Sequence, residues 1–180
     1  MLDQTVFQTQ YHEIKAGEIE RNVFSLIGSD WLLVTGGDRE KFNSMTVSWG
    51  GMGVLWNKNV AFIFIRRTRY TLEFIEKQPE FSLSVYPEQY RNELLRIFGR
   101  KSGRDCDKVA ESGFTPVETP FGTVAYAEAS LVMSCKKLYA GQLVKDNILD
   151  QVARTTMYAP DEEAHQVFIA EITGVWKRNA

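Results

Sequence analysis

Hydrophobic and polar residues alternate along most of this chain, which is the pattern of strands with one buried face. The alternation predicts strands at 22–26, 31–35, 41–49, 80–86, 129–139 and 165–176. Residues 60–66 are apolar on both faces and predict a strand that is buried on both sides. Residues 52–56 extend the strand before them, with a turn at 57–59, and 1–20 alternate weakly, as an entry segment or an edge strand.

Short helices are predicted between these strands. Residues 66–78 are amphipathic, with Thr68 placed to cap the helix and Pro79 just beyond its end. Residues 87–98 predict a second helix, whose inward-facing side chains are Leu94, Leu95 and Phe98.

A third short helix is predicted after the basic loop at 99–104, with Asp105 as its cap and Gly113 as its end. Two segments stay open: 114–127 is a loop or a broken strand, and 145–154 is a helix or a strand and linker. Many strands with a few short helices favour a mainly β fold, an antiparallel barrel of Greek-key type. The length of 180 residues favours a single domain over 1–180.

Composition narrows the class of protein. A net charge of −2 gives no global attraction to nucleic acid or to an anionic membrane, and no apolar run is long enough to span one. The first twenty residues lack the pattern of a signal peptide. Cys106 and Cys135 are far apart, which favours a cytoplasmic protein with free thiols, and two histidines make a histidine-built metal site improbable.

The most informative stretch is NSMTVSWGG at 43–51, because small hydroxyls occupy one whole face of its predicted strand. Side chains on the two faces are Asn43, Met45, Val47 and Trp49 on one, and Ser44, Thr46 and Ser48 on the other. Small hydroxyls leave room for a ligand and offer hydrogen bonds to it. The alternative is an ordinary half-exposed strand that ends at two glycines.

Basic side chains cluster at two places, Arg66, Arg67 and Arg69 before one helix and Lys101 and Arg104 in a later loop. Fixed cations beside hydroxyls at a helix start suit a phosphate group. The alternative for each cluster is a solvated charged face with weak ion pairs. Neither has the glycine spacing of a dinucleotide-binding turn or a phosphate-binding loop.

Other candidate groups are weaker. No nucleophile elbow surrounds any serine, so no catalytic dyad is evident. His165 is either a partly exposed residue at a strand start or a residue that faces a ligand. Cys106 lies near Lys101 and Arg104, which would lower its pKa, although an inert thiol is the simpler reading. Trp49 and Trp56 either flank a planar ligand or pack in the core.

Four segments in this order resemble the flavin reductase-like family, whose fold is the FMN-binding split barrel, and within it the small flavoredoxin-like proteins. They are NSMTVSWGG, RRTRYTLEFIE, GRKSGRDCDK and HQVFIAEITGV. The resemblance implies a homodimer that binds FMN near the subunit interface. Arg67 stands where the family often has proline, which changes the local turn.

The resemblance also implies which residues would hold the cofactor. These are Asn43, Ser44, Met45, Thr46, Val47, Ser48 and Trp49 along the strand, Arg66, Arg69, Tyr70 and Thr71 at the phosphate-side turn, and Lys101, Ser102, Gly103 and Asp105 in the second loop. His165 matches a histidine near the flavin face and is the one candidate for a catalytic role. No metal is implied.

Three functions remain open. The favoured one is an NAD(P)H-dependent flavin oxidoreductase that passes hydride through FMN to free flavin or to a protein acceptor. The second is an electron carrier with tightly bound FMN and a protein partner. The third is a non-enzymatic binding module on the same barrel, with heme or no cofactor. FMN is favoured over FAD, although nothing in the sequence excludes an added adenylate.

Overall fold

The computed structural model describes residues 2, 4–159 and 161–179. Its main sheet has eight strands, in the order β3-β2-β6-β9-β10-β5-β4 with β1 beside β10. Their bounds are β1 Tyr11–Ile14, β2 Leu32–Gly37, β3 Phe42–Val47, β4 Gly50–Leu55, β5 Lys58–Ile65, β6 Glu80–Val85, β9 Leu131–Gln142 and β10 Gln166–Arg178. Every pairing is antiparallel, so the predicted mainly β antiparallel fold is confirmed.

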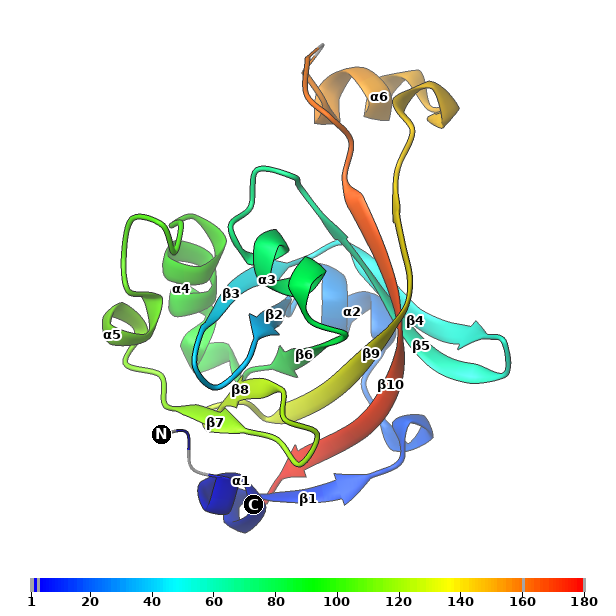
Figure 1. The fold of residues 1–180 in the computed structure, drawn as a ribbon. Helices are drawn as coiled ribbons and strands as arrows, with labels where there is room; N and C mark the ends of the chain where they lie inside the picture. Colours follow the sequence, from blue (N-terminus) through cyan, green and yellow to red (C-terminus); the bar gives the residue numbers. More distant parts are fainter. Residues whose placement is uncertain (1, 3, 160, 180) are drawn as a thin grey trace.

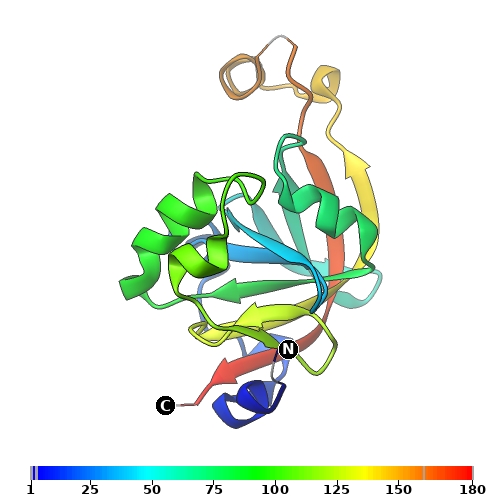
Figure 2. The ribbon, with the colours of Figure 1, turned by 60° about the vertical axis from the view of Figure 1, so that its left-hand side comes forward.

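The sheet curls on itself without closing (Figures 1 and 2). Its two end strands are β3 and β4, which follow one another in the chain but share no ladder in the described residues. The inside of the curl holds one apolar cluster, which includes Val34, Ile63, Leu83 and Phe168. A split barrel therefore exposes one edge of β3, and this edge positions the site described below.

A second apolar cluster fills the space outside the sheet. It is rich in aromatic rings, including Phe7, Phe98, Phe114, Tyr126 and Trp176. The helix α1 (Gln4–Gln10) and the hairpin of β7 (Pro116–Glu118) and β8 (Val124–Tyr126) cover it. The segment 114–127, left open by its sequence, is therefore a pair of short strands.

The N-terminal quarter differs from the sequence prediction. Residues 22–26 are not a strand, because α2 (Val23–Gly28) begins there. The Oδ1 atom of Asn22 accepts hydrogen bonds from the backbone of Phe24 and Ser25 at 2.9 and 3.3 Å, and this cap fixes the helix start. Within 1–20, α1 and the short turn η1 (Ala16–Glu18) flank the edge strand β1.

The helix predicted at 66–78 is α3 (Thr71–Lys77), but Tyr70 rather than Thr68 is its N-cap, and no side chain caps it. It packs closely on β2: a Cβ atom at Gly36 would lie 2.8 Å from the backbone nitrogen of Ile75. Glycine at this position therefore sets the distance between helix and sheet.

The helix predicted at 87–98 is built from shorter pieces. They are η2 (Glu88–Tyr90), α4 (Arg91–Glu93) and η3 (Leu94–Gly99), which is a π-helical turn. Leu94 and Phe98 are buried as predicted, but Leu95 is 39% exposed. The wider turn changes which side chains face inward.

The next helix, α5 (Lys108–Ser112), is capped by Asp107 and not by Asp105. The carboxylate of Asp107 accepts hydrogen bonds from Val109 and Ala110 at 2.9 and 3.1 Å. Gly113 ends the helix with a φ of 69°, as its sequence predicted.

An arm projects beyond the barrel, where β9 and β10 extend upward in Figure 1. It carries η4 (Lys145–Asn147) and α6 (Gln151–Met157), which settles the segment 145–154 as helical. The β4–β5 hairpin turns at Trp56 and Asn57, one residue earlier than predicted, with φ values of 52° and 58°. No helix of the described residues is long and apolar enough to cross a membrane.

Candidate functional site

The candidate site lies along the free edge of β3. This strand pairs with β2 on one side only, so the backbone groups of its other edge lack a strand partner. That edge meets η3 and α5: Thr46 Oγ1 donates to the carbonyl of Leu94 at 2.6 Å, and Lys108 Nζ donates to the carbonyl of Ser44 at 2.9 Å. Two hollows open beside this contact, one at each end.

The predicted hydroxyl row on β3 is partly used inside the protein. The Oγ atom of Ser44 lies 2.8 Å from Thr35 Oγ1 and 2.9 Å from the hydroxyl of Tyr126, and Ser44 is fully buried. The expectation of open space along the whole row is therefore wrong at Ser44. Thr46 and Ser48 do line a hollow, and their role toward a ligand stays a prediction.

The first hollow, named here the loop hollow, has a volume of about 100 Å³ and lies between the start of α3 and the loop at 100–103. It brings together the two basic segments that are far apart in the sequence. Its lining comprises Asn43, Met45, Thr68, Arg69, Tyr70, Thr71, Phe98, Arg100, Lys101, Ser102, Gly103 and Lys108.

Direct contacts hold these two segments against each other. Arg69 Nη1 donates to the carbonyl of Gly99 at 3.3 Å. In the other direction, Arg104 Nη1 donates to the carbonyl of Thr68 at 3.3 Å, and its guanidinium lies 4.7 Å from the centre of the Tyr70 ring. The concentration of cations at the loop hollow is therefore a property of the folded chain and favours an anionic ligand.

Glycine at 103 permits the closest contact in this wall. A Cβ atom there would lie 2.1 Å from Asn43 Oδ1 and 3.2 Å from Tyr70 Cδ1. Asn43 is itself fixed, because its Nδ2 donates to Thr71 Oγ1 at 2.7 Å. Any side chain at position 103 would push the loop away from β3.

The second hollow, named here the His165 hollow, has a volume of about 190 Å³. It is lined by Met45, Thr46, Val47, Ser48, Trp49, Phe64, Arg66, Arg69 and His165. Met45 and Arg69 line both hollows, so the two lie next to each other and together follow β3. We call the two together the β3 groove.

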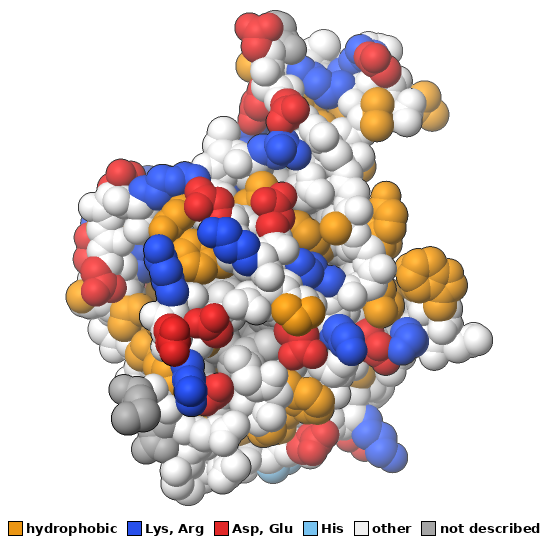
Figure 3. Space-filling model, in the orientation of Figure 1, with side chains coloured by type: hydrophobic (Ala, Val, Ile, Leu, Met, Phe, Trp, Pro, Cys, Tyr) orange, Lys and Arg blue, Asp and Glu red, His pale blue; other side chains and the backbone are white. Residues whose placement is uncertain are grey.

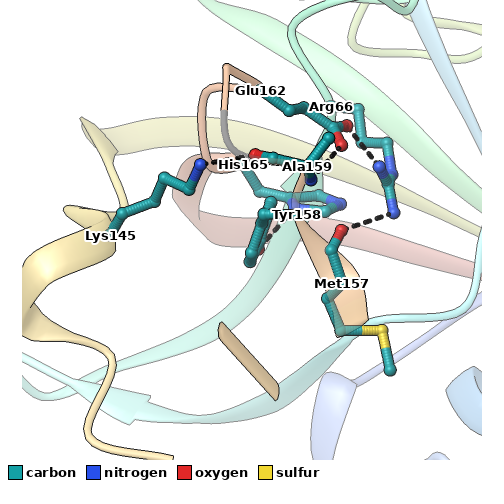
Figure 4. A network of polar contacts seen from close by, with 7 residues as sticks. All are labelled: Arg66, Lys145, Met157, Tyr158, Ala159, Glu162 and His165. Carbon is teal, nitrogen blue, oxygen red and sulfur yellow. Dashed lines mark hydrogen bonds and ion pairs between the residues drawn. The ribbon is translucent and has the colours of Figure 1, made fainter. Parts of the chain in front are cut away.

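His165 stands at the far end of the β3 groove and is 4% exposed. Its Nδ1 lies 2.7 Å from the hydroxyl of Tyr158 (Figure 4). Its ring centre lies 4.9 Å from that of Trp49. Burial, aided by the positive charge of Arg66, lowers the pKa of His165 to about 4. The imidazole is therefore neutral at pH 7.

Arg66 belongs to the His165 end of the groove, away from the loop hollow. Its guanidinium forms an ion pair with Glu162 and donates to the carbonyl of Met157 at 3.2 Å (Figure 4). The side chain therefore ties the barrel to the arm. The sequence could not show this, because Glu162 lies 96 positions later in the chain.

Two other predicted residues are placed at the margin. The side chain of Lys101 is 50% exposed, and its Nζ lies 2.5 Å from a carboxylate oxygen of Glu111. Asp105 lines neither hollow; its N–H donates to the carbonyl of Ser102 at 3.0 Å and closes the loop turn.

Lys108 is a residue that the sequence prediction missed. It is 6% exposed, and burial lowers its pKa to about 8. Its Nζ donates to the carbonyls of Ser44 and Phe98, at 2.9 and 3.5 Å, and no ion pair joins it to a carboxylate of the described residues. Its neighbour Asp107 is the cap of α5, a position that marks the helix start but not which helical side chain turns inward.

Metal ligands do not gather anywhere in the described part of the chain, where no three His, Cys, Asp or Glu side chains meet. Cys106 and Cys135 are free thiols, and Cys135 is buried in the barrel core. Burial raises the pKa of the Cys106 thiol. A lowered pKa at this cysteine, considered from its basic neighbours, is therefore wrong.

The buried neutral state of His165 predicts a specific pH dependence. An unfolded histidine has a pKa near 6.5, so between pH 6.5 and 4 the unfolded chain binds the proton and the folded chain does not. As the pH falls from 6.5 to 4, the free energy of unfolding should therefore decrease by about 2–3 kcal/mol more in the wild type than in His165→Gln. Urea denaturation at several pH values measures this difference, and exposed His12, replaced by glutamine, is the matched control. An equal dependence of the free energy of unfolding on pH in the wild type and in His165→Gln would contradict this prediction.

Solved structures of several flavin-related proteins are similar in fold to this chain. The FMN-binding domain of a flavin reductases-like enzyme from Shewanella baltica has a TM-score of 0.66 and 18% identity, over 93% of this chain and 76% of that one. Flavoredoxin of Desulfovibrio vulgaris has a TM-score of 0.64 and 22% identity, over 92% and 77%. An NADH:FAD oxidoreductase from Streptomyces globisporus has a TM-score of 0.59 and 16% identity, over 83% and 78%.

These identities are low, so the likeness shows the fold alone. None of the curated proteins compared with the chain matches it. Residues 24–180 match the family model of the flavin reductase like domain, and these residues include β3, the loop hollow and His165. The chain therefore belongs to the flavin reductase like domain family.

Proposed function

We propose that this protein binds FMN in the β3 groove and acts as an NAD(P)H-dependent flavin oxidoreductase. The observation that carries the proposal is the adjacency of two unlike hollows along one unpaired strand edge. Both hollows are lined by cations, and the His165 hollow is also bordered by an indole and a neutral imidazole. A phosphorylated planar cofactor requires both kinds of surface in this order.

The loop hollow fits the phosphate end of FMN. Arg69, Lys101 and Lys108 supply positive charge from three different segments. Ser102 and Thr71 add hydroxyls beside them. Charge-assisted hydrogen bonds of this kind are stronger than neutral ones, so a phosphate would anchor the cofactor here.

The His165 hollow fits the ring end. Met45 and Trp49 offer apolar surface, and Thr46 and Ser48 offer hydroxyls. When bound, the flavin ring supplies the redox chemistry and accepts hydride from a nicotinamide nucleotide. The hydrogen bond to Tyr158 would hold the His165 ring in place. Because His165 is neutral, the positive charge at this end of the groove would come from Arg66 and Arg69.

The proposed reaction predicts turnover with a nicotinamide nucleotide. The purified protein with added FMN should oxidise NADH or NADPH in steady state, followed by the loss of absorbance at 340 nm. FMN binding without turnover of either nucleotide would favour the electron carrier. If the purified protein is colourless and gains no flavin absorbance on soaking in FMN, the non-enzymatic binding module would be the remaining hypothesis.

The assignment of the loop hollow predicts a selective loss of affinity. Lys108→Met should weaken FMN binding by about 1.5–3 kcal/mol, the range for a hydrogen bond to a charged group, and change riboflavin binding little. Fluorescence titration of the protein freed of flavin measures both ligands. Lys108→Arg keeps the charge and should recover part of the loss.

The exposed residue Lys15, replaced by methionine, is the control for that titration. Equal losses for FMN and riboflavin would show that Lys108 supports the fold of the groove and does not bind the phosphate. This outcome would overturn the assignment of the loop hollow.

We also propose that the protein is a homodimer. The support is the arm, where Val144, Leu149, Val152 and Met157 are all exposed, Leu149 by 90%. Four apolar side chains on one projection indicate a surface that another chain covers. Sedimentation equilibrium should give twice the chain mass of 20.6 kDa, and Leu149→Asp with Val152→Asp should lower it. A monomeric wild type at micromolar concentration would contradict the proposal.

A further inference from the structure

Two adjacent arginines of the barrel meet two adjacent glutamates of the arm. Arg66 pairs with Glu162, and Nε of Arg67 lies 2.6 Å from a carboxylate oxygen of Glu163. Figure 3 shows basic and acidic side chains intermixed on the arm, so an ion pair on its own says little about function. The two pairs differ in one respect: Arg66 lines the His165 hollow, whereas Arg67 lines neither hollow of the β3 groove.

The carboxylate of Glu162 is held in place from two sides. One oxygen accepts a hydrogen bond from Arg66 Nη1, and the other accepts from the backbone N–H of Ala159 at 3.3 Å (Figure 4). The carbonyl of Ala159 in turn accepts from Lys145 Nζ at 2.6 Å. The hydrogen bonds from Arg66 and Ala159 lower the pKa of Glu162, so this side chain carries a full negative charge at pH 7.

These contacts also fix the direction of the Arg66 side chain. Its two terminal nitrogens donate to Glu162 and to the carbonyl of Met157, so both are directed at the arm. Arg69, the other arginine of the His165 hollow, donates to the carbonyl of Gly99, and no ion pair joins it to a carboxylate of the described residues. Glu162 therefore cancels one of the two positive charges at this end of the groove.

The charge of Glu162 acts inside the His165 hollow, although its side chain is not part of the lining. His165 stands in the wall of this hollow. Burial is the main cause of its lowered pKa; beside burial, the charge of Arg66 lowers this pKa and the charge of Glu162 raises it. A group bound in the hollow would experience the same two opposing charges.

We propose that Glu162 is a positioning residue that sets the reduction potential of the bound flavin, because it holds Arg66 and cancels its charge. The inference rests on the flavin site proposed above. A hydride carries two electrons and one proton, so its transfer oxidises the nicotinamide and leaves a neutral flavin ring with one additional negative charge. An uncompensated arginine beside the ring would stabilise that charge. With Glu162 in place, the flavin keeps a lower potential and passes its electrons on more readily.

The experiment measures the potential of FMN bound to the full chain, by titration against a redox dye. Glu162→Gln should shift the equilibrium between oxidised and reduced flavin at least tenfold toward the reduced form, a rise of about 30 mV for a two-electron couple. Arg66→Gln leaves Glu162 uncompensated and should shift this equilibrium in the opposite direction. A loss of structure at the arm would move both variants in the same direction, so the opposite signs separate charge from packing.

Two control variants accompany this titration. Glu163→Gln breaks the neighbouring ion pair, whose arginine lies outside both hollows, and should leave the equilibrium within twofold of the wild type. Glu162→Asp keeps the negative charge and should recover most of the wild-type potential.

A second measurement needs no flavin. The chain has two histidines, so NMR titration of the flavin-free protein, with His12→Gln to assign the signals, follows His165 by itself. Glu162→Gln should lower the pKa of His165, Arg66→Gln should raise it, and Glu163→Gln should do neither.

Three results would overturn the inference. They are an unchanged potential in Glu162→Gln, shifts of the same sign in Glu162→Gln and Arg66→Gln, and an equally large shift in Glu163→Gln. Failure of the flavin site is a separate result, because the wild type would then bind no FMN. The histidine titration would in that case still decide whether Glu162 controls the charge of the His165 hollow.

Discussion

The unpaired edge of β3 is the constraint on which the rest of this structure depends. A barrel that closed would cover this edge with another strand, and no groove would exist. Here the edge is bordered by η3 and α5, and the few bonds that reach it come from side chains such as Lys108. Backbone groups at an open edge are polar, fixed and close to the surface, which is what a planar polar cofactor needs.

The positive charge in the groove comes from residues that are far apart in the sequence. Arg69 and Lys101 belong to segments about thirty residues apart, and the fold brings them to one hollow. Arg66, Arg104 and Lys101 each pair with a carboxylate, of Glu162, Glu73 and Glu111, whereas no ion pair joins Arg69 to a carboxylate of the described residues. Clusters that look alike in the sequence thus divide into cations that pair with a carboxylate and a cation, Arg69, that does not.

Much of this architecture follows from the alternation of residues, and the exceptions have local causes. β3, β5 and β9 alternate or run apolar as the sheet requires, and the family motifs identify the fold. The strand predicted at 22–26 was wrong, because Asn22 caps a helix there although the residues alternate as in a strand. Leu95 turned outward because the π turn shifts helical spacing.

The site was harder to predict than the fold. The stretch around Asn43 and the two basic loops stood out in the sequence, because hydroxyls and clustered cations are unusual in a strand and a turn, and the fold brings them to one hollow. Lys108 was not predicted, because the sequence does not show whether a lysine is buried or exposed. Its environment is created by Ser44 and Phe98, which only the folded chain brings to it.

The ion pair between Arg66 and Glu162 has a mechanical consequence. One guanidinium is both a wall of the groove and the anchor of the arm. Under the proposed binding of FMN, a displacement of the arm would break this ion pair and leave the charge of Arg66 beside the flavin ring, and a change of charge on the ring would alter the strength of the ion pair. By linkage, the two effects must have equal free energy, so the arm and the redox state would each report on the other.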